Sequence, residues 1–87
     1  MQKASQVNAE IDLRGQLPEE ALENLGKYLD DAYMAGLKRA RVIHGKGTGV
    51  LRKTLQAYLK THPLVESYQI GDYFEGGMGV TVVELKP

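Results

Sequence analysis

Apolar residues recur at steps of three and four over residues 18–35, and this period constrains the fold more than any other feature of the chain. The stripe consists of Leu22, Leu25, Leu29 and Ala32. Pro18 suits the first turn of a helix, where its missing N–H costs nothing, and Gly36 is typical of a helix end. The sequence therefore predicts one long amphipathic helix over residues 18–35.

Short runs of alternating or β-branched residues predict four strands, at residues 10–15, 41–44, 65–70 and 80–85. A second helix is expected between Thr48, as its N-cap, and Pro63. A flexible glycine-rich loop at residues 76–79 precedes the last strand. The order is β-α-β-α-β-β. Right-handed crossovers then predict an α/β fold, an α+β two-layer sandwich whose four-stranded mixed sheet carries both helices on one face.

The length of 87 residues fits one domain, which we expect over residues 9–87 after a polar, flexible tail or linker at residues 1–8. The absence of cysteine excludes disulfides, thiolate zinc sites and cysteine nucleophiles. No apolar run is long enough to span a membrane, and no basic-then-apolar leader is present. We expect a cytoplasmic protein with no membrane partner.

Charge is balanced overall, with 11 basic and 11 acidic residues, but it is unevenly distributed. No acidic residue occurs over residues 32–65. The basic residues of that stretch are Lys38, Arg39, Arg41, Lys46, Arg52, Lys53 and Lys60. Such a block predicts either one positive face for a polyanion or an ordinary solvated surface, and charge alone leaves both open.

The segment that follows the second predicted strand suggests phosphate binding. Gly45, Gly47 and Gly49 let an anion approach the backbone amides, and the helix that follows presents free N–H groups. Lys46 adds a charge and Thr48 a hydroxyl, and Arg52 lies one turn into the helix. The spacing matches neither a Walker A loop nor a dinucleotide fingerprint. The alternative is a plain strand-to-helix turn.

Three other polar residues allow a catalytic and a structural interpretation. His44 is either a general acid or base beside the phosphate, or a strand-end histidine bonded to a carbonyl. Asp12 either binds a metal or water, or ties down the loop before Gly15. Arg14 either contacts phosphate or pairs with a nearby carboxylate. If the first two strands are neighbours, these residues share one edge of the sheet.

Together these segments resemble the Smr (small MutS-related) domain, in its form at the C-terminus of the second bacterial MutS branch. The resemblance rests on Ile11–Gly15, His44–Gly49 with Leu51–Arg52, and Gly76–Val82, in that order along the chain. The His-Gly-x-Gly motif of the family is complete at residues 44–47. Its Leu-Asp-x-His motif is present at Asp12, but Arg14 replaces the histidine, which rules out a two-histidine mechanism.

The resemblance implies a fold like the C-terminal domain of a bacterial translation initiation factor, and an endonuclease that nicks DNA with little sequence preference. It also implies branched or supercoiled DNA, RNA or the ribosome as partners, and a parent protein in DNA repair that suppresses recombination, with an upstream ATPase and dimerisation region. In the expected mechanism the amides of Gly45–Gly49 and Lys46 hold the phosphate, and Arg14 and Arg52 offset charge. Asp12 would position Mg²⁺, Mn²⁺ or water, and His44 would transfer a proton.

The alternatives are a module that binds DNA, RNA or the ribosome without cleavage, and an enzyme acting on a small phosphate compound.

Overall fold

The computed structural model describes residues 7–87. The elements follow in the order β1 (Glu10–Asp12), α1 (Pro18–Met34), β2 (Arg39–Ile43), α2 (Val50–Lys60), β3 (Val65–Ile70), the 3-10 turns η2 (Tyr73–Glu75) and η3 (Gly77–Gly79), and β4 (Val80–Leu85). This confirms the predicted β-α-β-α-β-β order. The segment expected to be a flexible glycine-rich loop instead contributes to two short, regular turns.

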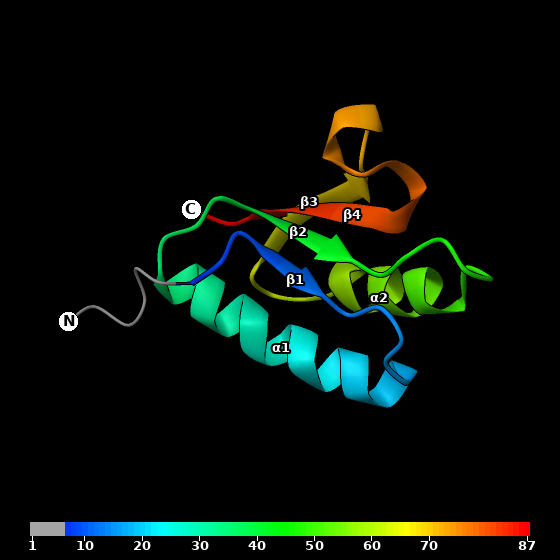
Figure 1. Ribbon diagram of the computed structural model, residues 1–87. Helices are drawn as coiled ribbons and strands as arrows, with labels where there is room; N and C mark the ends of the chain where they lie inside the picture. The colour runs from blue at the N-terminus through cyan, green and yellow to red at the C-terminus, as the bar shows by residue number, and fades with distance from the viewer. Residues whose placement is uncertain (1–6) are drawn as a thin grey trace.

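The four strands form one mixed sheet in the order β1-β2-β4-β3. β1 pairs parallel to β2, and β4 pairs antiparallel to both β2 and β3. The crossovers from β1 to β2 and from β2 to β3 therefore move across the sheet in the same direction. Because such crossovers are right-handed, both helices lie on one face, as predicted and as Figure 1 shows.

The core lies between that face and the helices. α1 buries Ala21, Leu25, Leu29 and Ala32, so the predicted apolar stripe is confirmed apart from Leu22, which is half-buried. The other buried members of the cluster are Leu13, Val42, Leu55, Leu59, Val65, Val83 and Leu85. Together they join both helices to the sheet and hold the ends of β1 and β2 in a fixed relation. Neither helix is long and apolar enough to cross a membrane in the part described.

Several predicted boundaries differ from the structure. α1 ends at Met34, one residue before the prediction, and Gly36 follows its cap with a φ of 78°. β2 runs from Arg39 to Ile43, so it starts two residues earlier than expected and leaves His44 just beyond its end. This shift matters because His44 becomes part of the loop that leads into α2.

The prediction that Thr48 is the N-cap of α2 was wrong. Gly49 takes the cap position with a φ of 88°, a left-handed conformation that favours glycine. The Thr48 hydroxyl accepts only a long contact of 3.4 Å from the Val50 N–H. Because the chain turns into the helix at a left-handed glycine, no side chain covers the first amides of α2.

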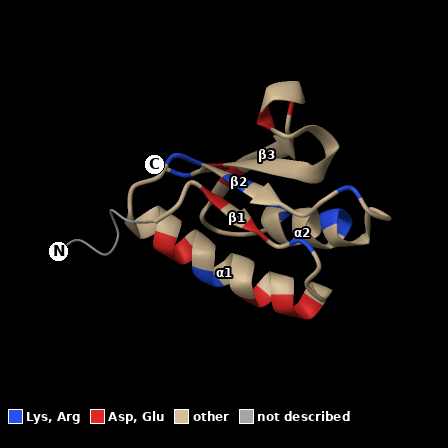
Figure 2. Cartoon of the chain, viewed as in Figure 1, with Lys and Arg blue, Asp and Glu red and all other residues tan. Residues whose placement is uncertain are grey.

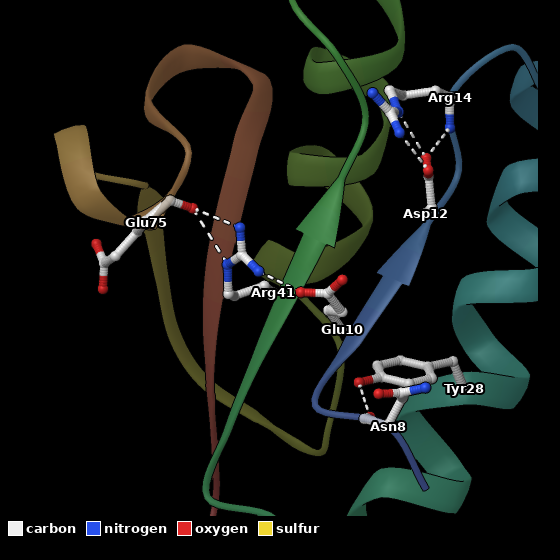
Figure 3. A network of polar contacts seen from close by, with 7 residues as sticks. All are labelled: Asn8, Glu10, Asp12, Arg14, Tyr28, Arg41 and Glu75. Carbon is white, nitrogen blue, oxygen red and sulfur yellow. Dashed lines mark hydrogen bonds and ion pairs between the residues drawn. The ribbon is translucent and has the colours of Figure 1, made fainter.

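The tail or linker predicted at residues 1–8 is described only at its last two positions, since residues 1–6 lie outside the described part. Val7 packs against the core, and the Asn8 carbonyl accepts a hydrogen bond from the Tyr28 hydroxyl (Figure 3). Burial, with a smaller contribution from the nearby Glu10 carboxylate, raises the pKa of Tyr28 to about 12. Val7 and Asn8, which the sequence analysis assigned to the tail, therefore contact the domain.

The segment that contains η2 and η3 lies over the sheet face opposite the helices (Figure 1). Arg41 of β2 holds it by donating two hydrogen bonds to the Glu75 carbonyl, at 3.2 and 3.0 Å, while also pairing with Glu10 (Figure 3). Arg39 pairs with the Glu75 and Glu84 carboxylates at 3.0 and 2.8 Å. These contacts fix the turn that leads into β4 and, through it, the position of Gly79.

Candidate functional site

The parallel pairing of β1 and β2 brings the two predicted motifs to one edge of the sheet. The Leu13 N–H donates to the Ile43 carbonyl at 2.7 Å, so the chain beyond β1 runs beside the chain beyond β2. A pocket of about 280 Å³ lies between the two segments. Its lining consists of Gly15, Gln16, Pro18 and every residue from 44 to 52. The shared edge expected from the sequence is confirmed.

The loop into α2 presents a row of backbone amides to this pocket. Within residues 7–87, no hydrogen-bond acceptor is present for the N–H groups of Lys46, Gly47, Thr48, Gly49, Leu51 and Arg52. The first turn of α2 carries no acidic side chain. Free amides at the positive end of a helix dipole favour an anion. The Gly45 N–H is not among them, because it donates to the Gly79 carbonyl at 2.9 Å.

Two cations lie on the pocket without a carboxylate partner. The described part of the chain contains ion pairs for Arg14, Arg39 and Arg41, and none for Lys46 or Arg52. The Arg52 guanidinium lies over Gly49, where a Cβ would be 3.1 Å from Nη2. Figure 2 shows the basic residues of the loop and of α2 at the end of the molecule where the acidic first turn of α1 also lies, but the residues that line the pocket include Lys46 and Arg52 and no acidic side chain. The pocket is therefore positively charged.

Four of the seven residues in the basic block recognised in the sequence fall into two groups in space. Arg39 and Arg41 lie on the face opposite the helices, where acidic side chains neutralise them. Lys46 and Arg52 line the pocket. The other three residues of the block, Lys38, Lys53 and Lys60, do not line the pocket, so only part of the block contributes to its charge.

Asp12 and Arg14 form a pair at the same edge but outside the pocket lining. The Asp12 carboxylate accepts from Arg14 Nε at 2.9 Å, Nη2 at 2.6 Å and the backbone N–H at 3.0 Å (Figure 3). These hydrogen bonds, with the arginine charge, lower the pKa of Asp12 to about 2. The Arg14 side chain lies against the loop, since a Cβ on Gly45 would be 3.4 Å from its Cγ. Arg14 thus pairs with a nearby carboxylate, and Asp12 accepts an N–H of the segment that precedes Gly15.

His44 is buried beneath the loop, with 5% of its surface exposed. Its Nδ1 lies 2.9 Å from the Gly45 carbonyl oxygen and its Nε2 lies 2.8 Å from Thr81 Oγ1. Burial and the charge of Arg52 lower the pKa of His44, and the Gly45 contact opposes this shift. Both ring nitrogens have protein partners, so the geometry favours the structural interpretation of His44.

We expect His44 to titrate below its ordinary pKa of 6.5, since desolvation disfavours the imidazolium. The unfolded chain then binds this proton at a higher pH than the folded chain. The contribution of His44 to the free energy of unfolding is complete above about pH 6.5 and is lost as the pH falls from there toward the folded-state pKa. An NMR titration of the ring and urea unfolding between about pH 7.5 and 5 would measure both effects.

The matched control for this titration is His62→Gln, which removes the other histidine of the chain. His44→Gln should flatten the pH dependence of stability over this interval, whereas His62→Gln should preserve it. A ring midpoint for His44 at or above 6.5 would contradict the burial argument.

The donor set at this edge does not make a metal site. Within the described residues, no three His, Asp or Glu side chains gather in a way that could hold an ion. Asp12 is the carboxylate beside the loop, and Arg14 occupies both of its oxygens. One carboxylate is a poor ligand set for Mg²⁺ or Mn²⁺.

Two residues of the site, Thr81 and Gln56, were not predicted from the sequence. Thr81 is fully buried and contacts His44, and Gln56 of α2 donates to the Thr81 hydroxyl at 3.0 Å. The available signal was a hydroxyl residue on the face of β4 that otherwise carries the core residues Val83 and Leu85. Tyr73 and Phe74 of η2, away from the pocket lining, are 90% and 92% exposed and lie edge-to-face at 5.4 Å.

Comparisons with known proteins agree with this architecture. The family model described as "Smr domain" matches residues 11–86. "Endonuclease MutS2" of Clostridium tetani is 62% identical over 80 residues, which cover 92% of this chain and 10% of the relative. "Endonuclease MutS2" of Acetivibrio thermocellus is 54% identical over 86 residues, which cover 99% and 11%. The chain thus spans about a tenth of the length of these curated relatives.

Solved structures share the fold. The Smr domain of Thermus thermophilus MutS2 superposes with a TM-score of 0.87 at 45% identity, over 90% of this chain and 98% of that one. YdaL, a stand-alone small MutS-related protein from Escherichia coli, gives a TM-score of 0.86 at 26% identity, over 91% and 65%. Since the family model and these relatives cover nearly all of the described fold, including the pocket and the loop into α2, the chain belongs to the Smr domain family.

Proposed function

We propose that this domain binds the sugar-phosphate backbone of nucleic acid at the pocket beyond β1 and β2, and that it cleaves that backbone as an endonuclease with little sequence preference. The observation that carries the proposal is the row of amides at residues 46–49, 51 and 52, for which the described residues provide no acceptor, together with Lys46 and Arg52, which have no ion pair among those residues. Amides and cations that meet phosphate oxygens recognise no base, so the site should tolerate many sequences. The name "Endonuclease MutS2" of the relatives supports the cleavage step.

Each group at this edge has a distinct expected role. The amides of residues 46–49 and the Lys46 ammonium bind non-bridging oxygens of the phosphate. Arg52 and Arg14 offset the negative charge that builds on the phosphoryl oxygens as water attacks. The P–O bond to the leaving oxygen then breaks, and that oxygen takes up the proton that the attacking water releases. Asp12 is ionised over the whole neutral range, since its pKa is about 2, so it orients Arg14 and an attacking water rather than removing a proton as an efficient base.

His44 acts differently from the sequence-based expectation in this proposal. Proton transfer to a ligand would require one of its two ring hydrogen bonds to break. We therefore assign His44 to the support of the loop. No step is assigned to Mg²⁺ or Mn²⁺, because Asp12 alone does not provide a site for either ion.

The direct test is a nicking assay on supercoiled plasmid and on structured RNA, with Mg²⁺, Mn²⁺ or chelator. The parent protein should nick, and Lys46→Ala should lower the rate by about tenfold or more, because it removes a cation from the phosphate. Lys27→Ala on α1 is the matched control, since it removes the same charge from an exposed position away from the pocket. Equal cleavage by all three proteins would show that the nicking comes from a contaminant and would overturn the proposal.

A non-catalytic binding module is the second candidate, and the bonded ring of His44 favours it. This function predicts no cleavage under any metal condition. It also predicts binding that weakens with salt, with a slope reduced by about one in Lys46→Ala. Tight binding of a free mononucleotide would instead indicate an enzyme of small phosphate compounds.

A longer protein that carries this domain would have further roles. We propose that a chain carrying this domain works in the cytoplasm on branched or supercoiled DNA, where it suppresses recombination, with RNA or the ribosome as other partners. An upstream ATPase and dimerisation region would supply the choice of substrate. Comparing nicking by this domain with nicking by a full-length MutS2 relative would show how much activity the domain carries alone.

A further inference from the structure

A chain of hydrogen bonds joins α2 to the start of the loop at residues 45–49, which we call the phosphate loop. It starts at Gln56 Nε2, passes through Thr81 Oγ1 at 3.0 Å and His44 Nε2 at 2.8 Å, and ends with His44 Nδ1 at 2.9 Å from the Gly45 carbonyl. Thr81 is fully buried and His44 is nearly so. With water excluded, each group of the chain depends on its neighbour for a partner.

The last contact determines the direction of the whole chain. A carbonyl oxygen only accepts, so the Nδ1 that faces Gly45 must carry the proton. The neutral ring then has a lone pair on Nε2, which requires a donor, and the Thr81 hydroxyl is the group in place. Once the hydroxyl proton points to His44, the Thr81 oxygen accepts from the Gln56 amide. All three side chains are satisfied in this one arrangement.

The chain acts on the loop through the Gly45 peptide units. The Gly45 carbonyl is held by the ring, while the His44 and Gly45 N–H groups both donate to the Gly79 carbonyl, at 3.0 and 2.9 Å. These bonds fix the backbone at the start of the loop, because they engage both the N–H and the carbonyl group of Gly45. The amides that follow, from Lys46 onward, have no protein acceptor and line the pocket. Fixed dipoles bind an anion better than mobile ones because they need no reorganisation.

We propose that Gln56 and Thr81 are positioning residues of the phosphate loop, which act through a neutral His44 ring held in its Nδ1–H tautomer. This inference rests on the proposed function in that the loop is the phosphate site. It assigns a role to two residues that never touch the ligand. It also implies that His44 positions the loop only while its ring is uncharged.

The first readout is the tautomer, which requires no ligand. Side-chain ¹⁵N NMR of the parent protein at about pH 7.5 should show a protonated Nδ1 and an unprotonated Nε2 on His44. Thr81→Val keeps the shape but loses the hydroxyl, so the His44 Nε2 signal should move, and Thr81→Ser should restore it. Gln56→Glu offers only acceptors to Thr81 and should shift His44 toward a protonated Nε2. A parent protein with the Nε2–H tautomer would overturn the proposal.

The second readout is affinity for a fluorescein-labelled DNA oligonucleotide. Thr81→Val should weaken binding by about tenfold, the size expected for loss of one buried hydrogen bond, while Thr81→Ser should stay within about threefold of the parent. Gln56→Leu, at a half-buried position, is the second variant if Thr81→Val fails to fold. A folded Thr81→Val with parental affinity and an unmoved His44 signal would refute the positioning role.

These experiments distinguish failure of the proposed function from failure of the positioning role. If the parent protein does not bind DNA, the proposed function is wrong. The positioning role is then tested by the His44 tautomer and by the amide chemical shifts of residues 46–49. Those shifts should move in Thr81→Val and return in Thr81→Ser. Unchanged amide shifts in a folded Thr81→Val would show that the hydrogen-bond chain does not reach the loop.

Discussion

Replacing Arg14 by alanine is expected to slow nicking of supercoiled plasmid by about 10²- to 10³-fold, the range measured when one donor to a transition-state oxyanion is removed. The Arg14 side chain lies against Gly45, and its Nε and Nη2 donate hydrogen bonds to Asp12. Nη1 donates to no acceptor among the described residues, so we expect it to donate to a phosphate bound at the loop. Arg14 is 63% exposed, so the variant should fold and unfold like the parent. Single-turnover nicking rates and a thermal melt of the same samples measure both quantities.

Two further variants separate the roles of Arg14 and Asp12. Arg14→Lys keeps the charge but loses the planar fork, so it should recover only part of the rate. If Asp12 serves mainly to hold Arg14, then Asp12→Ala should resemble Arg14→Ala, and the double variant should lose little more than either single one. A double variant whose losses multiply would mean that Asp12 acts on water by itself, independently of Arg14.

Replacing Gly76 by alanine is expected to lower the free energy of unfolding by about 3 kcal/mol, through a left-handed backbone and overpacking together. Gly76 has a φ of 115°, and a Cβ there would collide with Val80 Cγ2 and lie 3.4 Å from Arg41 Nη2. Relief would have to move the turn away from β4 and from the arginine that anchors it. For a domain of this size the melting temperature should fall on the order of 15 °C.

Gly77→Ala is the matched control, because the next glycine has a φ of 61° but nothing within 4 Å of its Cβ position. It should cost only about 1 kcal/mol, from the left-handed backbone alone. Equal destabilisation by the two variants would mean that the contact with Val80 contributes nothing. Because this turn carries Gly79, whose carbonyl holds the loop, Gly76→Ala should also weaken DNA binding even where it remains folded.

The sequence by itself determined the order of the elements, the buried face of α1 and the place of the glycine-rich loop before α2. These properties depend on neighbours within a few positions: apolar steps of three and four, a proline at a helix start, and glycines before a helix. Even the pairing of Asp12 with Arg14 was foreseeable, because the two residues lie two positions apart. The Thr48 cap failed for a local reason, since a left-handed Gly49 displaced it.

Only the tertiary structure decided which groups of the site are free. His44 finds its partner at Thr81, 37 positions away, and Arg41 finds the Glu75 carbonyl 34 positions away. The insertion of β4 between β2 and β3 creates both contacts, and no local pattern encodes it. A buried polar group must be satisfied by whatever the packed chain places beside it. His44 is buried, so both of its ring nitrogens have protein partners, whereas Lys46 is exposed to water and has no ion pair among the described residues.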